Sequence, residues 1–119
     1  MVEESTIVRL MDIANAACHT GKVFEARTIF DNILVIKPGH VPARIGLALS
    51  HIVVDEHAKA EAMLREILAD HEGDADAQAL LALCLTFMKR NDEAKALLEP
   101  LKDNTDSAGG LARSLLLHV

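Results

Sequence analysis

Residues 21–39 read GKVFEARTIFDNILVIKPG, a segment with its own start, apolar stripe and stop. Ala26, Phe30 and Ile33 are spaced by four and then three residues, so they fall on one face of a helix. The glycine at 21 ends whatever helix precedes it, and Pro38-Gly39 ends this one, because proline cannot continue a helix and glycine accepts a left-handed backbone. The segment predicts a helix over about 23–36 that packs through its Ala26 face.

The same pattern recurs along the chain at a constant interval. Ala26, Ala60 and Ala94 are 34 residues apart (60−26 and 94−60). Further positions keep this period without insertion, and they are Phe30/Leu64/Leu98, Ile33/Ile67/Leu101, Ile13/Leu47/Leu81, Ala14/Ala48/Ala82, Ala43/Ala77 and Gly39/Gly73. Several series in one register indicate three helix–turn–helix repeats over residues 7–40, 41–74 and 75–108.

Each repeat predicts two antiparallel helices that approach closely where both carry alanine, as at Ala14 and Ala26. The expected helices are about 5–19, 23–36, 41–53, 57–70, 75–88, 91–103 and 107–118. Pro100 falls inside the sixth of these and should kink or shorten it. Repeats 2 and 3 lack the glycine at the turn within the repeat, where they have Asp55 and Lys89.

Composition limits the function classes. The chain of 119 residues is 50% hydrophobic but only 3% aromatic, and its net charge is −6, which makes nucleic acid and anionic membranes unlikely partners. No apolar run reaches the roughly 18 residues of a membrane span. The acidic N-terminus does not have the order of a signal peptide, and two cysteines outside any metal spacing suit free buried thiols. A cytoplasmic protein is therefore expected.

The 34-residue repeat resembles the tetratricopeptide-repeat (TPR) family. The resemblance implies an all-α fold, with three repeats in a right-handed superhelical stack and a C-terminal capping helix, as one domain over residues 1–119. It also implies a concave groove lined by the first helix of each repeat. The predicted groove residues are Met11, Asn15, Ile45, Leu49, Ile52, Val53, Ala79, Leu83, Phe87 and Leu117.

The middle of this predicted groove is strongly apolar, and a large exposed apolar surface usually marks an interaction site. The expected guest is an amphipathic helix of another protein. Two alternatives remain open at this stage. The seventh helix could fold back and fill the groove, or two copies could close groove on groove as a homodimer. Capture of an acidic peptide tail, as some TPR domains perform with Lys and Asn, is not expected because only Asn15 matches that pattern.

Neither an enzyme nor a metal site is expected. No histidine pair among the six has the i, i+4 spacing of a helical metal site, and His57 occupies a packing position at a turn. His19 cannot activate Cys18, because adjacent helical residues diverge by about 100°. There is no phosphate-binding glycine loop and no nucleophile elbow, so no cofactor is predicted.

In size, repeat number and groove chemistry, the chain is similar to the small TPR chaperones of bacterial type III secretion, a virulence system. This resemblance implies a chaperone that clasps the amphipathic helix of a needle or other export subunit, with or without a second small helical co-chaperone. Leu49→Asp is then predicted to keep the fold and abolish binding. The alternative function is a general TPR scaffold or adaptor within a multiprotein complex.

Overall fold

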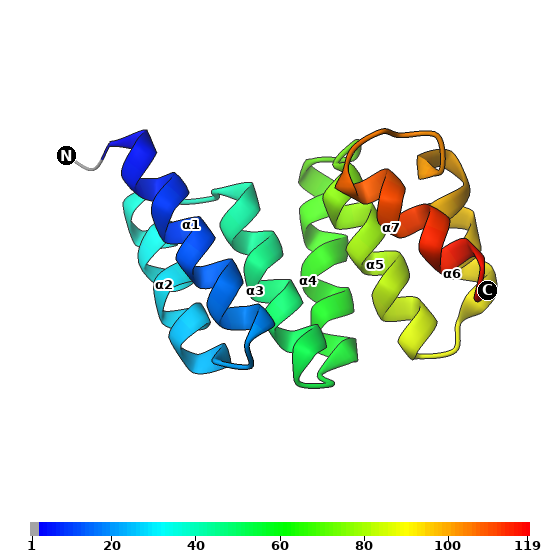
Figure 1. Ribbon diagram of the computed structural model, residues 1–119, viewed down its shortest axis with the longest axis horizontal. Helices are drawn as coiled ribbons and strands as arrows, with labels where there is room; N and C mark the ends of the chain where they lie inside the picture. Colours follow the sequence, from blue (N-terminus) through cyan, green and yellow to red (C-terminus); the bar gives the residue numbers. More distant parts are fainter. Residues whose placement is uncertain (1–2) are drawn as a thin grey trace. The chain divides into compact units, whose positions relative to one another are not determined.

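The computed structural model describes residues 3–119, so the first two residues of the predicted 1–119 domain lie outside it. The described residues are helical and turn structure without strands, which confirms the all-α prediction (Figure 1). They form two compact units, Met1–Glu56 (unit 1) and His57–Val119 (unit 2). Unit 1 contains α1 (Glu4–His19), α2 (Val23–Ile36) and α3 (Val41–Val53). Unit 2 contains α4 (His57–Asp70), α5 (Ala75–Phe87), α6 (Asn91–Leu98), the 3₁₀ turn η1 (Glu99–Leu101) and α7 (Ser107–Leu116).

Unit 1 is a three-helix core in which α2 packs against both α1 and α3. Ala14 and Ala26 are both 0% exposed, in line with a close approach of α1 and α2. The Phe30 ring is also fully buried, and it faces Gly46 of α3, where an added Cβ would lie 2.3 Å from the ring. Gly46 is therefore required by the size of Phe30.

In unit 2 the central helix is α5, which packs against α4, α6 and α7. Ala82 and Ala94 are fully buried, like their counterparts in unit 1. The core position of Phe30 is taken by Leu64, and the position of Gly46 by Leu80. The smaller core residue on α4 is thus accompanied by a larger, half-buried residue on α5.

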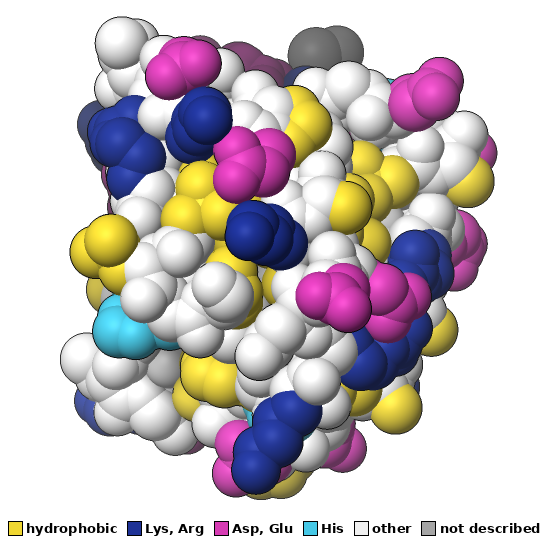
Figure 2. All heavy atoms as spheres, turned by 90° about the vertical axis from the view of Figure 1, so that its right-hand side faces the viewer, with side chains coloured by type: hydrophobic (Ala, Val, Ile, Leu, Met, Phe, Trp, Pro, Cys, Tyr) yellow, Lys and Arg dark blue, Asp and Glu magenta, His cyan; other side chains and the backbone are white. Residues whose placement is uncertain are grey.

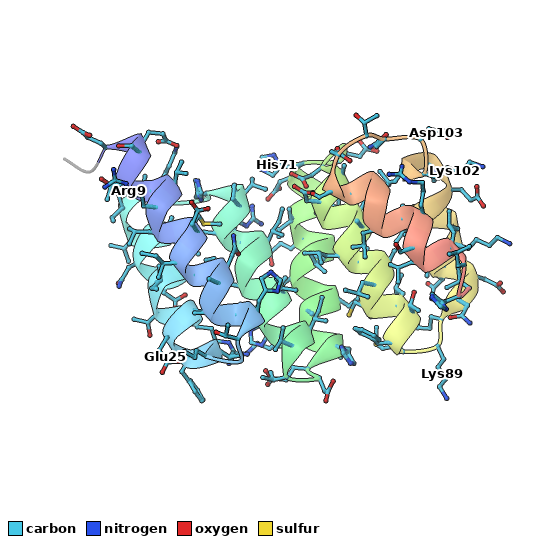
Figure 3. All side chains as sticks on the ribbon, viewed as in Figure 1. Arg9, Glu25, His71, Lys89, Lys102 and Asp103 are labelled. Atoms are coloured by element: carbon cyan, nitrogen blue, oxygen red, sulfur yellow. The ribbon has the colours of Figure 1, made fainter. Side chains whose placement is uncertain are left out.

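The turn within each repeat keeps the same backbone whatever residue occupies it. Gly21 has φ +83°, and Asp55 and Lys89, one repeat and two repeats further on, have φ 63° and 60°. Lys89 extends away from the helices into solvent at the α5–α6 turn (Figure 3). The fold therefore imposes a left-handed residue here even where the sequence supplies a side chain, at a cost of roughly 1–2 kcal/mol.

Pro100 shortens the sixth helix, as predicted. The α-helix ends at Leu98 and the chain continues as the η1 turn, instead of running on to 103. The following helix begins at Ser107, where the Asp106 side chain accepts a hydrogen bond from the Gly109 amide at 2.9 Å. A Cβ at Gly109 would lie 2.0 Å from the Asn104 carbonyl oxygen, so this glycine allows the preceding loop to close onto α7.

The first and last helices differ from the internal ones on their outer faces. Ile13 is 56% exposed, whereas Leu81 at the same repeat position is 1% exposed. Beside Ile13, Asp12 occupies the position of the buried Gly46, and Arg9 extends from the same helix (Figure 3). In α7, Leu116 replaces the alanine that allows close helix approach in all three repeats. α1 and α7 thus carry a polar and a bulky residue at positions that glycine and alanine occupy in α3, substitutions typical of solenoid caps.

Candidate functional site

The first candidate surface is the face that α1 and α3 share in unit 1, where these two helices pack against each other. Met11, Asn15, Ile45 and Leu49 are half-buried on it, and Met11 and Leu49 also pack against the core. Val53 is 42% exposed at the end of α3. Ile52, predicted to line the groove, is only 5% exposed, so its side chain offers little surface to a partner.

The second candidate surface is the face of α5 and α7 in unit 2, which also pack together. Phe87 is 53% exposed and Leu117 is 83% exposed, while Leu83 is half-buried. Ala79, predicted to line the groove, is 1% exposed, so its side chain offers almost no surface to a partner. A contiguous apolar patch on a helix face, rather than a single exposed side chain, is the usual mark of a contact surface.

His57 supports the position of Phe87. The two rings lie 5.2 Å apart between centroids and are tilted by 36°, an arrangement typical of favourable aromatic pairs. The expectation that His57 occupies a packing position agrees with this contact.

Sequence reasoning did not single out the outer face of α2. Phe24 and Val35 on this helix are 80% and 79% exposed. A comparison of the repeats could have identified Phe24 as unusual, because the equivalent residues of the other repeats are Ala58 and Asp92. Eleven residues at about 1.5 Å each place these two side chains about 16 Å apart along the helix, so they are separate surface residues rather than one patch.

Unit 1 contains a buried polar cluster that ties α2 to α3. The Arg27 guanidinium donates to Ser50 Oγ at 3.0 Å, approaches His51 Nδ1 at 2.9 Å and pairs with Glu56 at 3.0 Å. Ser50 and His51 are 0% and 7% exposed and are the buried polar residues of the described chain. Hydrogen bonds from His51 and Arg27 hold the pKa of Glu56 below its ordinary value. The cluster leaves Arg27, Ser50 and Glu56 mutually satisfied.

Unit 2 has an ion pair at the same two repeat positions, with the charges reversed. Glu61 takes the place of Arg27 and Arg90 takes the place of Glu56, and they pair at 2.8 Å. Arg65 adds a second hydrogen bond to Glu61 at 2.9 Å, and Glu93 pairs with Arg90. Burial raises the pKa of Glu61, but the hydrogen bonds from Arg90 and Arg65 outweigh it and hold that pKa below its ordinary value. Both pairs link a second helix to the turn of the next repeat.

The surroundings of the two cysteines favour a structural role over a reactive one. Cys18 and Cys84 are free and buried, and burial raises the pKa of both thiols. Cys84 Sγ donates to the His57 carbonyl oxygen, whereas His19, beside Cys18 in sequence, is exposed. A raised thiol pKa disfavours the reactive thiolate. Within residues 3–119, no three His, Cys, Asp or Glu side chains are grouped as a metal site would require.

The exposed end of unit 2 around α6 and α7 is not uniformly apolar. Figure 2 shows hydrophobic side chains there in separate patches, interrupted by Lys, Arg, Asp and Glu. This broken pattern is typical of a solvated surface and gives no support to a second large contact site at this end. The candidate site therefore consists of the α1/α3 face and the α5/α7 face.

Helix pairs that recur every 34 residues, with apolar side chains on the first helix of each pair, are typical of helical-repeat proteins that bind other proteins. The tetratricopeptide-repeat profile matches residues 19–84 and 54–116, which together cover well over half of the chain. The chain belongs to the tetratricopeptide-repeat family, whose repeats mediate protein–protein interaction. None of the curated proteins matches it significantly. No helix within the described residues is long and apolar enough to cross a membrane.

Proposed function

We propose that this protein is a chaperone that binds an amphipathic helix of a client. The binding surfaces are the α1/α3 face and the α5/α7 face, which the first helices of the repeats form. The observation that carries the proposal is the exposure of Val53, Phe87 and Leu117 on those faces. An apolar side chain left in water on a helix face gains roughly 25 cal/mol for each Å² that a partner covers. A client helix with apolar residues at i, i+3, i+4 and i+7 has the matching geometry.

The proposed client is a subunit that polymerises through the same helix, such as the needle subunit of a type III secretion system or another export subunit. Small size, three repeats and apolar first helices support this choice, since they are what the chain shares with the secretion chaperones. Binding the helix would occupy the surface that one subunit presents to the next. The chaperone would thus prevent premature assembly in the cytoplasm, with a second small helical protein as a potential co-chaperone.

Surface substitutions test the proposal with little effect on the core. Leu49 packs against the core of unit 1, so Leu49→Asp combines a binding effect with a folding effect. Leu117→Asp is cleaner because this side chain is 83% exposed, and Val35→Asp on α2 is its matched control at 79%. We expect Leu117→Asp to abolish co-purification of a client from the native host, with circular dichroism unchanged.

The control defines what would contradict the proposal. Val35 lies outside both candidate faces, so Val35→Asp should retain the client in full. If both variants retain it, the α5/α7 face is not used, and Val53→Asp then tests the α1/α3 face in the same way. Retention of the client by both Leu117→Asp and Val53→Asp would exclude the proposed surfaces.

A scaffold or adaptor role is the second candidate, and it is favoured by the burial of Ile52 and Ala79. Their burial reduces the apolar area that a client must cover, so the protein can be soluble without a guest. A scaffold would remain a folded monomer after purification and bind short peptides weakly. A groove-on-groove homodimer would instead give twice the chain mass, and Leu117→Asp or Val53→Asp should dissociate it.

A further inference from the structure

The apolar α5/α7 face ends in a group of carboxylates that we call the acidic rim, formed by Asp74, Asp76 and Asp106. Two of them are occupied as helix caps, since Asp74 accepts from the Ala77 amide at 2.9 Å and Asp106 from the Gly109 amide at 2.9 Å. Asp76 has no hydrogen bond or ion pair among the described residues. The rim therefore includes one carboxylate without a cation.

Electrostatics at the rim favour a positive partner. Partial desolvation, followed by the nearby carboxylates of Asp74 and Asp106, raises the pKa of Asp76, although its side chain is exposed to solvent. A neighbouring cation would oppose this rise in the pKa, because opposite charge favours the ionised form. The net charge of −6 acts in the same direction by attracting cationic partners from a distance.

Asp76 is in register with the apolar residues of the face. Asp76, Leu83 and Phe87 stand at i, i+7 and i+11 along α5, so they lie within about 20° of one line on the helix. The rise of about 1.5 Å per residue places Asp76 about 10 Å from Leu83 and about 16 Å from Phe87 along the axis. A helix lying along α5 would thus meet apolar side chains at one end and a carboxylate at the other.

Unit 1 shows that this acidic end is not a general feature of the repeats. The residues equivalent to Asp76 are Val8 and Pro42, and the residue equivalent to Asp74 is His40. His40 caps α3 with a ring nitrogen, and Glu3 provides no side-chain cap to α1. The α1/α3 face therefore has no counterpart of the acidic rim, and any charge selection belongs to unit 2.

Building on the proposed function, we propose that the α5/α7 face selects a client helix carrying a lysine or arginine about seven to eleven residues from its apolar anchors. The basic residue lies beside Asp76, and the apolar anchors cover Leu83, Phe87 and Leu117. The apolar contacts supply most of the affinity, whereas the charge pair fixes the direction of the client helix and discriminates among amphipathic helices.

Matched synthetic peptides test this selection on the full-length protein. The probe is an 18-residue helical peptide with three leucines on one face and one lysine nine residues from their centre, and its twin carries glutamine instead of the lysine. We expect Asp76→Asn to weaken binding of the lysine peptide about three- to fivefold, as for a solvent-accessible ion pair. The glutamine peptide should change by less than twofold, as measured by fluorescence anisotropy at about 0.05 M salt.

Asp92→Asn is the control substitution. Asp92 occupies the second position of α6, just as Asp76 occupies the second position of α5, but it lies outside the candidate face. It should leave the affinity of both peptides unchanged, and circular dichroism should be the same for the two variants. Raising the salt to about 0.5 M should remove the preference for lysine, because screening weakens exposed charge pairs.

The outcomes separate this inference from the proposed function. If both peptides bind equally and Asp76→Asn affects neither, charge selection is excluded while helix binding stands. If neither peptide binds, the proposed function itself fails, and this inference with it. A lysine preference that Asp92→Asn removes as strongly as Asp76→Asn would place the effect in net charge rather than in the acidic rim.

Discussion

Unit 1 and unit 2 use the same two repeat positions for an ion pair and place opposite charges on them. Arg27 pairs with Glu56 in unit 1, and Glu61 pairs with Arg90 in unit 2, at 3.0 Å and 2.8 Å. The repeat geometry therefore determines which positions meet, whereas the sign of each charge is free as long as the partners are complementary. A repeat protein can in this way vary its sequence without changing its packing.

The surroundings of the two pairs differ more than the pairs do. In unit 1 the helix packed beneath the pair carries Ser50 and His51, which are buried polar side chains. In unit 2 the same positions hold Cys84 and Leu85, both 0% exposed. Arg27 thus hydrogen-bonds to a buried hydroxyl as well as pairing with a carboxylate, whereas the partners of Arg90 are the carboxylates of Glu61, 16% exposed, and Glu93, 52% exposed. The ion pair should therefore contribute more to the free energy of unfolding in unit 1 than in unit 2.

Replacing the arginine of each pair gives the largest expected difference. Arg27→Ala should lower the free energy of unfolding by about 1–3 kcal/mol, because it removes two hydrogen bonds to the buried Ser50 and the ion pair with Glu56. Arg90→Ala should cost only about 0.2–1 kcal/mol, because Glu61 keeps Arg65 and the pair is partly exposed. Urea denaturation of both variants measures the difference, and equal losses would contradict the comparison.

The next largest effect on stability is expected where unit 1 has Phe30 and Gly46 and unit 2 has Leu64 and Leu80. Gly46→Ala should destabilise by about 1–2 kcal/mol, since overpacking against the Phe30 ring outweighs the higher helix propensity of alanine. Adding Phe30→Leu, which copies unit 2, should recover part of this loss. Thermal denaturation of the single and double variants checks it, and strictly additive losses would show that the two residues do not compete for space.

The left-handed turn residues give a smaller effect of opposite sign. Lys89→Gly should stabilise the protein by about 0.5–1 kcal/mol, because glycine adopts the φ of 60° without strain. Asp55→Gly should gain less, since aspartate tolerates this backbone better than lysine. Gly21→Ala is the reverse control and should destabilise. A loss of stability in Lys89→Gly would mean that the lysine side chain makes a needed contact.

The smallest expected effect is the contribution of Glu61 to the pH dependence of stability. Because the pKa of Glu61 is lowered in the folded protein, its contribution is fully present above its ordinary pKa of 4.5 and is lost as the pH falls through the folded value. Glu61→Gln should therefore flatten the fall in stability below about pH 4.5. Denaturation midpoints at pH 7 and pH 3.5 measure this, and an unchanged acid sensitivity would exclude the link as its source.

Most of the architecture could be predicted because the repeat is strict. Six of the seven helices match the expected bounds within two residues, and the exception is the helix that Pro100 shortens. The left-handed Asp55 and Lys89 were not foreseen, since side chains rarely occupy such a backbone and only the repeat position indicates it. Phe30 and Gly46 were also not paired in advance, because their contact joins residues of different repeats.

The candidate site was predicted less completely. The repeat positions identified which residues lie on the first helix of each repeat, but they did not indicate how far each side chain is exposed. Ile52 and Ala79 stand at the same kind of position as Val53 and Leu83 and yet are buried. Exposure depends on packing by neighbouring helices, which a period of 34 does not encode. That residues 1–119 unfold as one domain stays a prediction, to be checked by a single denaturation transition.

The most direct test of the account is the native mass of the untagged protein purified from its own host, compared with that of Leu117→Asp. We predict that the unmodified chain is isolated in a stable complex with a small helical polypeptide, and that Leu117→Asp is isolated alone and folded. A folded monomer for both proteins would contradict the chaperone proposal and leave the scaffold role.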